Sequence, residues 1–303
     1  MITTVGSIAL DTTRTTAATA TEVPGGSAVH FALASSLLSK TSVVSCVGGD
    51  FPKAFLEKMS KRGIDVSNIG IEKHEKTFRF HSTFSADFQD RSSDLTQLNV
   101  FGKFEPKLTA SQRKAEIAFI GTLTPRIQLS VIGQMEKPKL VAMDTIEYYI
   151  KNERKGVLEV LSKVDCAIFN ESEARMLCRK TNLVACGKDI LKMGPEFCII
   201  KKGEHGSILF ARGSHPHPFP GFPLEEIVDP TGAGDAFAGG FLGHLSSCGC
   251  QKKGQDLARA MAWGTVMGSI AVEGFGTDPL LKASKKAAQE RYETYRSLMH
   301  YEE

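Results

Sequence analysis

The chain has 303 residues, of which 42% are hydrophobic and 23% charged, as is typical of a soluble globular protein of one large or two modest domains. The formal net charge of +3 is small and no run of five like charges occurs, so neither nucleic acid nor a membrane surface is expected as a partner. No signal peptide is evident, and the seven cysteines include no Cys-x-x-Cys pair, so we expect reduced thiols and a cytoplasmic protein.

Strand-like and helix-like segments alternate along most of the chain. Apolar strand-like runs occur at Ile2 to Leu10, Val43 to Gly48, Ile117 to Gly121, Leu140 to Asp144 and Ala167 to Asn170. A helix is predicted after the second run, capped by Asp50, with Pro52 in its first turn and Gly63 at its end. This repeat predicts an α/β fold with a mostly parallel sheet, in which ligands bind at the carboxyl ends of the strands.

One segment departs from this alternation. From Thr77 to Phe84 phenylalanine occupies every second position apart from Ser82, which predicts a strand with three phenylalanines, Phe78, Phe80 and Phe84, on one face and Arg79 and His81 on the other. Together with the threonine-rich stretch Thr12 to Val23, it predicts a small antiparallel flap inserted into the α/β unit. An edge hairpin packed on its own sheet is the alternative.

Two further patterns lie in the second half of the chain. Asn170 is followed three residues later by Glu173, which is the pattern of an ordinary helix cap. The segment from Lys201 to Gly206 joins two strand-like runs, Phe197 to Lys201 and Ser207 to Ala211, and this arrangement is typical of a hairpin turn.

The most informative run is Asp229 to Leu242, where Gly232, Ala233 and Gly234 precede Asp235 and a helical apolar pattern. The first N–H groups of a helix have no intrahelical partner and carry partial positive charge, so small residues here allow the backbone to surround an anion closely. A carboxylate at this place suits the removal of a proton from a hydroxyl while the N–H groups stabilise a transferred phosphoryl group. A capped helix with an acid that favours the helix dipole is the alternative.

This run resembles the C-terminal signature of the ribokinase-like, PfkB carbohydrate kinase family, and the resemblance extends over essentially the whole chain. It implies one kinase domain over residues 1–303, a three-layer α/β/α sandwich with a mostly parallel central sheet. A small β lid is expected from residues 11–24 and 72–104. By this resemblance Asp235 is the catalytic base, and the backbone of Gly232, Ala233 and Gly234 forms the anion hole.

The same resemblance implies an acceptor site in the N-terminal third. Asp11 matches the aspartate that hydrogen-bonds substrate hydroxyls, and Gly25, Gly26 and Ser27 match the double-glycine turn against the substrate. His30 stands where the family usually has asparagine, and Ser27 where lysine or alanine is common. These departures concern the identity of the acceptor rather than the phosphoryl chemistry.

ATP and Mg²⁺ are the cofactors that the resemblance implies. Asn170 and Glu173 match an element that organises Mg²⁺ through water, and Asp229 and Thr231 match positions that often help to hold a monovalent cation such as K⁺. Residues matched to the ATP site are Lys201, Gly203, Gly206, Thr265, Met267, Gly274 and Gly276.

The expected activity is therefore transfer of the γ-phosphate of ATP to a hydroxyl of a small sugar-like acceptor. The chain has no Gly-x4-Gly-Lys-Ser/Thr motif, and no Gly-x-Gly-x-x-Gly follows a strand-like run, which disfavours a P-loop enzyme and a dinucleotide-dependent oxidoreductase. An adenosine-like nucleoside kinase and a catalytically silent ligand-sensing relative remain as alternatives. The expected partners are ATP and the acceptor, with homodimerisation through the lid as in some family members.

Overall fold

The computed structural model describes residues 1–86, 88 and 91–299. Within them a nine-stranded sheet forms the centre of the molecule. From one edge to the other its strands are β13 (His217–Phe219), β12 (Ser207–Ala211), β11 (Phe197–Lys201), β10 (Cys166–Asn170), β9 (Leu140–Asp144), β8 (Ile117–Ile120), β1 (Ile2–Val5), β4 (Thr41–Gly48) and β5 (Asp65–Glu72). The seven strands from β11 to β5 are parallel, and β12 and β13 are antiparallel additions at one edge.

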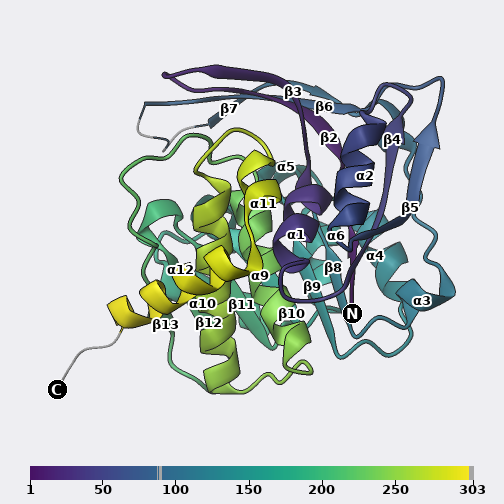
Figure 1. Cartoon of the computed structure of the whole chain (residues 1–303). Coiled ribbons are helices and arrows are strands. Elements are labelled where there is room, and N and C mark those ends of the chain that lie inside the picture. The colour runs from purple at the N-terminus through teal and green to yellow at the C-terminus, as the bar shows by residue number, and fades with distance from the viewer. Residues whose placement is uncertain (87, 89–90, 300–303) are drawn as a thin grey trace.

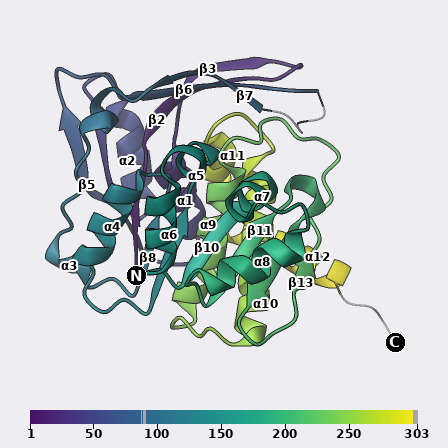
Figure 2. The same cartoon turned by 180° about the vertical axis from the view of Figure 1, so that it is seen from behind.

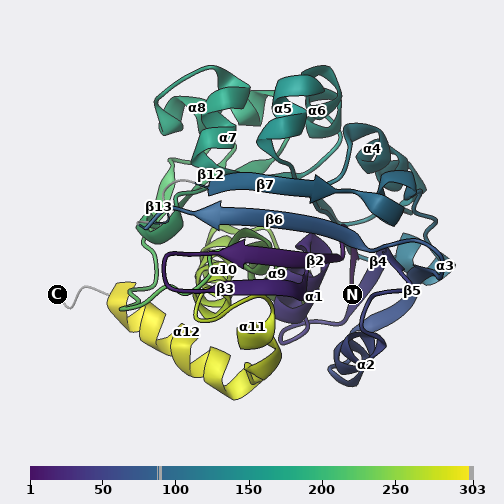
Figure 3. The same ribbon diagram turned by 90° about the horizontal axis from the view of Figure 1, so that it is seen from above.

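Helices cover both faces of this sheet, as the view from above shows (Figure 3). One face carries α1 (Ser27–Ser35), α2 (Lys53–Lys61), α9 (Ala233–Ser247), α10 (Gly254–Ala271), α11 (Asp278–Lys282) and α12 (Lys285–Met299). The other, in front in Figure 2, carries α4 (Pro125–Gln134), α5 (Glu147–Asn152), α6 (Arg154–Leu161), α7 (Glu171–Cys178) and α8 (Leu183–Lys192). The short α3 (Ala110–Arg113) precedes β8. The expected three-layer α/β/α sandwich is confirmed.

Strand β10 shows why the apolar runs predicted buried strands. Successive side chains of a strand point to opposite faces. Cys166 and Ile168 pack into the core shared with α9, whereas Ala167 and Phe169 pack into the core shared with α7 and α8. A parallel strand with helices on both faces therefore needs a continuous apolar run rather than an alternating one. In the part of the chain that the structure describes, no helix is long and apolar enough to cross a membrane.

A second sheet of four described strands lies over one end of the sandwich (Figure 1). Its order is β3 (Thr19–Gly25), β2 (Ala9–Arg14), β6 (Phe78–Phe84) and β7 (Arg91–Gln97). The outer pairs are antiparallel, but the central pair β2–β6 is parallel, so the expectation of a wholly antiparallel flap is wrong. The two hairpins come from separate parts of the chain and enter the lid sheet in the same direction. Residues 87 and 89–90 of the expected lid segment, and 300–303 of the expected domain, lie outside the described residues.

The expected single strand Ile2 to Leu10 is divided into β1 and β2. Between them the chain leaves the large sheet and passes close to the start of α1, where a Cβ at Gly6 would lie only 2.7 Å from Ser27 Oγ. The Ser7 N–H donates to Ser27 Oγ at 3.1 Å, and the Ser27 N–H donates to Ser7 Oγ at the same distance. The end of β1 therefore fixes both the lid and the first turn of α1.

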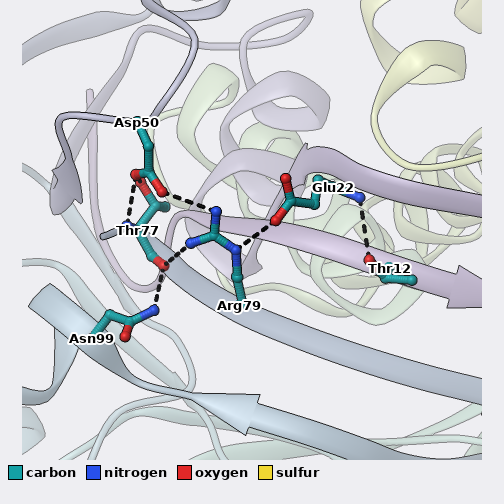
Figure 4. Close-up of polar contacts among 6 residues, drawn as sticks. All are labelled: Thr12, Glu22, Asp50, Thr77, Arg79 and Asn99. Carbon is teal, nitrogen blue, oxygen red and sulfur yellow. Dashed lines mark hydrogen bonds and ion pairs between the residues drawn. The ribbon is translucent and has the colours of Figure 1, made fainter. Parts of the chain in front are cut away.

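Asp50 does not cap α2, which begins at Lys53 after Pro52 without a side-chain cap. Its carboxylate instead accepts hydrogen bonds from the N–H and hydroxyl of Thr77, at 2.8 and 2.7 Å, and pairs with Arg79 at 2.9 Å. Arg79 also donates to Glu22 on β3 at 2.6 Å and to the Thr77 carbonyl, as Figure 4 shows. This network ties the lid sheet to the end of β4. A cap prediction from local sequence cannot detect a partner 27 residues away.

Candidate active site

The run that begins at Asp229 forms a tight turn at the start of α9. Gly232 precedes the helix with φ 77°, a left-handed conformation that glycine adopts without a Cβ penalty. Asp235 lies in the first turn, as predicted. The Ala233 N–H donates to the Pro230 carbonyl at 3.2 Å. The other first N–H groups of a helix lack intrahelical carbonyl partners, so the turn presents donors at the start of α9.

The loop before α9 is held by Asp229 and Thr231. One Asp229 oxygen accepts from the Thr231 N–H at 2.8 Å and the other from the Gly276 N–H at 3.1 Å. The Thr231 hydroxyl lies 3.2 Å from the Thr13 hydroxyl on β2. The lid, the start of α9 and the loop at Gly276 are thus joined around one buried carboxylate. A cation at Asp229 and Thr231 stays a prediction.

Lys201 comes from the end of β11 and reaches the start of α9. Its Nζ is 3.3 Å from Asp144 Oδ2 at the end of β9, and a Cβ on residue 234 would lie 2.6 Å from that Nζ. Burial lowers the pKa of Lys201, but the charges of Asp144, Glu173 and Asp235 outweigh it, so its pKa lies above the ordinary value. A charged ammonium group therefore lies against Gly234 of the expected anion hole.

Asp11 lies at the base of the lid on β2 and is buried. Its Oδ2 accepts from the Gly26 N–H at 3.2 Å, and there is no space for a side chain at Gly25, where a Cβ would overlap that carboxylate. Burial raises the pKa of Asp11 to about 7; the Gly26 N–H opposes this shift, and the charges of Asp229 and Asp235 add to it. Asp11 and Asp235 therefore belong to one electrostatic site.

The next residues of α1 have supporting positions. Ser27 is buried, and its hydroxyl forms a hydrogen bond with the Ser7 hydroxyl where the chain passes from β1 to β2. His30 is only 1% exposed, and its ring lies directly against Gly232, where a Cβ would be 2.2–2.4 Å from three ring atoms. The expected contact of His30 with the acceptor stays a prediction. Burial lowers the pKa of His30 to about 4, so the ring is neutral.

Asn170 and Glu173 form the helix cap that was the alternative interpretation. Asn170 Oδ1 accepts from the Glu173 N–H, and Glu173 Oε2 accepts from the Asn170 N–H, both at 2.8 Å. Their electrostatic neighbour is Lys201, which pairs with Asn170 in the β10–β11 register. The element therefore lies at the site, and its role in organising Mg²⁺ stays a prediction. Among the described residues no group of three His, Cys, Asp or Glu could hold a metal ion directly.

The remaining expected ATP residues are more dispersed. Gly203 and Gly206 have positive φ in the turn after β11, which contains a short 3-10 helix, η2 (Gly203–His205), as expected for a hairpin. Gly274 and Gly276 follow α10, and Gly276 contacts Asp229 and the lid residue Val23. In contrast, Thr265 bonds to the Met261 carbonyl within α10. Met267 is 0% exposed and packs against Gly240 in the core, so its side chain does not reach a surface site.

Asp144 and Thr13 have site positions that the sequence analysis did not assign. The signal for Asp144 was present, because it ends an apolar strand of a parallel sheet, where ligands collect. Its pairing with Lys201 depends on which strands are neighbours, and that order is a property of the fold. Thr13 had no separate signal within a threonine-rich stretch.

Comparison with known proteins decides the family. The model of the pfkB family carbohydrate kinases matches residues 1–283. The chain belongs to the pfkB family. A cytidine kinase of Thermococcus kodakarensis is 32% identical to this pfkB-family chain over 251 residues, which cover 80% of the chain and 87% of that relative.

Solved structures agree with the pfkB-family fold. A nucleoside kinase of Burkholderia thailandensis in complex with inosine has a TM-score of 0.78 and 18% identity, covering 98% of this chain and 99% of its own. The ribokinase of Arabidopsis thaliana, complexed with ribose and ATP, has a TM-score of 0.75 and 19% identity, covering 96% and 98%. The expectation of an ATP-dependent kinase is thus confirmed at the level of the family, whereas a carbohydrate acceptor is not.

Proposed function

We propose that this protein transfers the γ-phosphate of ATP to a hydroxyl group of a nucleoside. The observation that carries the proposal is the convergence of three groups at one end of the sheet. Asp235 lies in the first turn of α9, the Lys201 ammonium lies against Gly234, and Asp11 is close enough to Asp235 for its pKa to be raised by that charge. A base, a cation with N–H donors, and a hydroxyl-binding carboxylate are the parts that phosphoryl transfer to an alcohol requires.

In this proposal Asp11 and the Gly25–Gly26 turn hold the acceptor by its hydroxyl groups. Asp235 accepts the proton of the attacking hydroxyl while the acceptor oxygen forms a bond to the γ-phosphorus. The bond between that phosphorus and the β,γ-bridging oxygen breaks, and its electron pair leaves with ADP. N–H groups at the start of α9 stabilise the negative charge of the phosphoryl group during transfer.

A nucleoside is favoured over a simple sugar by the lid. In the parallel β2–β6 pair, Phe80 is the register partner of Asp11, so the two side chains lie on the same face of the lid sheet. Because of this register with Asp11, we assign Phe80 to the base, beside an Asp11 that binds the ribose. The relationship to a cytidine kinase supports the same choice.

The oxygen donors of Asn170 and Glu173 fit a Mg²⁺ ion held mainly by nucleotide phosphates and water. Both side chains are committed to the helix cap, so they suit an outer, water-mediated role rather than direct coordination. Mg²⁺ bound there would neutralise phosphate charge. Use of K⁺, location in the cytoplasm and a homodimer through the lid stay predictions.

The test is ADP formation by purified protein with MgATP and a panel of cytidine, inosine, adenosine, ribose and fructose. We expect one or more nucleosides to be phosphorylated with a higher kcat/KM than either sugar. Fructose or ribose as the best acceptor would replace the nucleoside assignment by a sugar. No product with any acceptor, despite measurable ATP binding, would favour the ligand-sensing alternative.

A further inference from the structure

The ion pair between Lys201 and Asp144 is largely removed from solvent. The lysine side chain is 17% exposed and the aspartate side chain 9%, and their charged atoms are 3.3 Å apart. Most other ion pairs in the described part of the chain lie on the surface, where they contribute little to stability. A charged pair in this position needs a reason other than stability, because taking both ions out of water is costly.

Asp144 is rigidly placed. Its Oδ1 accepts from the Thr145 N–H at 2.6 Å, and its backbone carbonyl accepts from the buried amide of Gln128 at 2.8 Å. These bonds leave Oδ2 directed to Lys201. Because β9 and β11 flank β10 in the sheet, their carboxyl ends bring the acid and the lysine together from residues 57 positions apart.

Lys201 has other carboxylates within electrostatic reach. Glu173 and Asp235 both act on its charge, in addition to Asp144. If Lys201 moved to Asp235, it would stabilise the ionised form of the proposed base and make it a weaker proton acceptor. It would also leave the space beside Gly234, where the transferred group is expected to lie. The flexible lysine stem makes such a move easy unless a fixed acid holds the ammonium group.

We propose that Lys201 contacts the phosphoryl group during its transfer, and that Asp144 is the positioning residue that holds Lys201 beside Gly234 and away from Asp235. This inference rests on the proposed phosphoryl transfer. What it adds to the proposed function is a role for Asp144, which no sequence motif indicated. In this role Asp144 acts through Lys201, with which its Oδ2 pairs.

The first experiment compares Asp144→Asn with Glu159→Gln. Glu159 on α6 pairs with Lys163, just after that helix, at 3.5 Å. The two side chains are 56% and 50% exposed, so this variant removes an acid from an ordinary surface pair. We expect Asp144→Asn to lower kcat about 10- to 100-fold with the KM for ATP changed less than about threefold. Glu159→Gln should match the wild type. An unchanged kcat in Asp144→Asn, or a change only in KM, would overturn the inference.

A second measurement does not depend on turnover. The affinity for MgADP is measured by calorimetry with and without aluminium fluoride, which mimics the phosphoryl group in transfer. We expect wild type to bind MgADP more tightly when aluminium fluoride is present, and expect Lys201→Met and Asp144→Asn to lose most of that gain while binding MgADP alone normally. An equal gain in wild type and both variants would overturn the inference.

These arms separate the two claims. If the proposed function is wrong, the wild-type protein will have no kinase activity. If only this inference is wrong, the variants will behave as the wild type in the aluminium fluoride titration. Asp144→Glu guards against a folding defect, because it retains the carboxylate. It should recover part of the lost kcat, and failure to recover any, in a protein that melts at the wild-type temperature, would contradict a role in holding Lys201.

Discussion

The ring of His30 lies directly beneath Gly232, so that helix α1 supports the turn from which α9 starts. A Cβ at position 232 would lie 2.2 Å from His30 Nδ1 and 2.3 Å from Cγ. Both ring nitrogens are buried, and neither has a hydrogen-bond partner in the described structure. His30 therefore acts here by its shape, as a neutral ring that fills the space under the expected anion hole.

This contact predicts the effect of Gly232→Ala. The new methyl group would collide with His30 and would also occupy a left-handed backbone conformation, which costs about 1–2 kcal/mol for a residue with a Cβ. We expect a lower melting temperature and, because the turn must move, a loss of kcat of at least about tenfold. Steady-state kinetics and thermal melts measure the two effects.

Gly249→Ala is the matched control. Gly249 also has a positive φ, 73°, but no atom would lie within 4 Å of its Cβ. This variant should lose only the stability that a Cβ costs in a left-handed backbone conformation, with kcat as in the wild type. If both variants lose the same stability and neither loses turnover, the contact between His30 and Gly232 does not shape the site.

Acceptor binding should depend on the ionisation of Asp11. Burial raises the pKa of this carboxyl to about 7, so it is mostly ionised above pH 7 and protonated below. A carboxylate accepts two hydroxyl hydrogen bonds, and its protonated form accepts fewer. We therefore expect the KM for the acceptor to rise as the pH falls below about 7, by up to about tenfold per pH unit. The pH profile of kcat/KM for the acceptor measures this.

Asp11→Asn provides the comparison, because its amide does not titrate. Its KM should be high and independent of pH between 5 and 8. The free energy of unfolding of the wild type should also depend on pH in a definite direction, compared with that of the variant. A carboxyl with a raised pKa keeps its proton in the folded state, so this group lowers stability as the pH rises from about 4 to about 7. A wild-type KM without pH dependence would show that Asp11 does not bind the acceptor as an anion.

The ion pairs of Arg79 that tie the lid to β4, here called the lid anchor, should affect the KM for the acceptor more than the affinity for ATP. Arg79→Met removes the ion pairs with Glu22 and Asp50 that tie the lid to the end of β4. We expect the KM for the acceptor to rise roughly fivefold, with ATP affinity unchanged. Arg126→Met, which removes an exposed pair with Glu105, is the control. Equal kinetics in the two variants would mean that the anchor has no part in acceptor binding.

Phe80 should distinguish nucleosides from simple sugars. If its ring lies against the base, Phe80→Ala should raise the KM for cytidine or inosine by about 10-fold and leave the KM for ribose nearly unchanged, since only the nucleoside has an aromatic ring to stack. Phe80→Tyr should retain tight nucleoside binding. Equal losses for nucleoside and ribose would instead indicate a general effect on the lid.

The sequence predicted much of this fold because buried parallel strands have a simple signature. The runs that begin at Leu140 and Ala167 are short, apolar and followed by helical patterns, and they correspond to β9 and β10, respectively. The first turn of α9 was equally clear, since small residues, an acid and a helical apolar pattern occur together around Asp235. Such local signals do not depend on the rest of the molecule.

What could not be predicted depends on pairs of distant residues. The break between β1 and β2 is set by the start of α1, the direction of β6 by its parallel partner β2, and the position of Asp50 by Thr77 and Arg79. His30 occupies a sequence position next to the acceptor turn, but the approach of α9 places it in the core. Strand order similarly decides that Asp144 meets Lys201.

The central claim is that Asp235 removes the proton from the acceptor hydroxyl during phosphoryl transfer. The most direct test is a single-turnover measurement of acceptor phosphorylation by wild type and Asp235→Asn, with the dissociation constant for MgATP determined for both. The account predicts a rate of transfer at least about 100-fold lower in the variant, with MgATP bound within about threefold of the wild-type affinity. A variant that transfers phosphate at near the wild-type rate would contradict it.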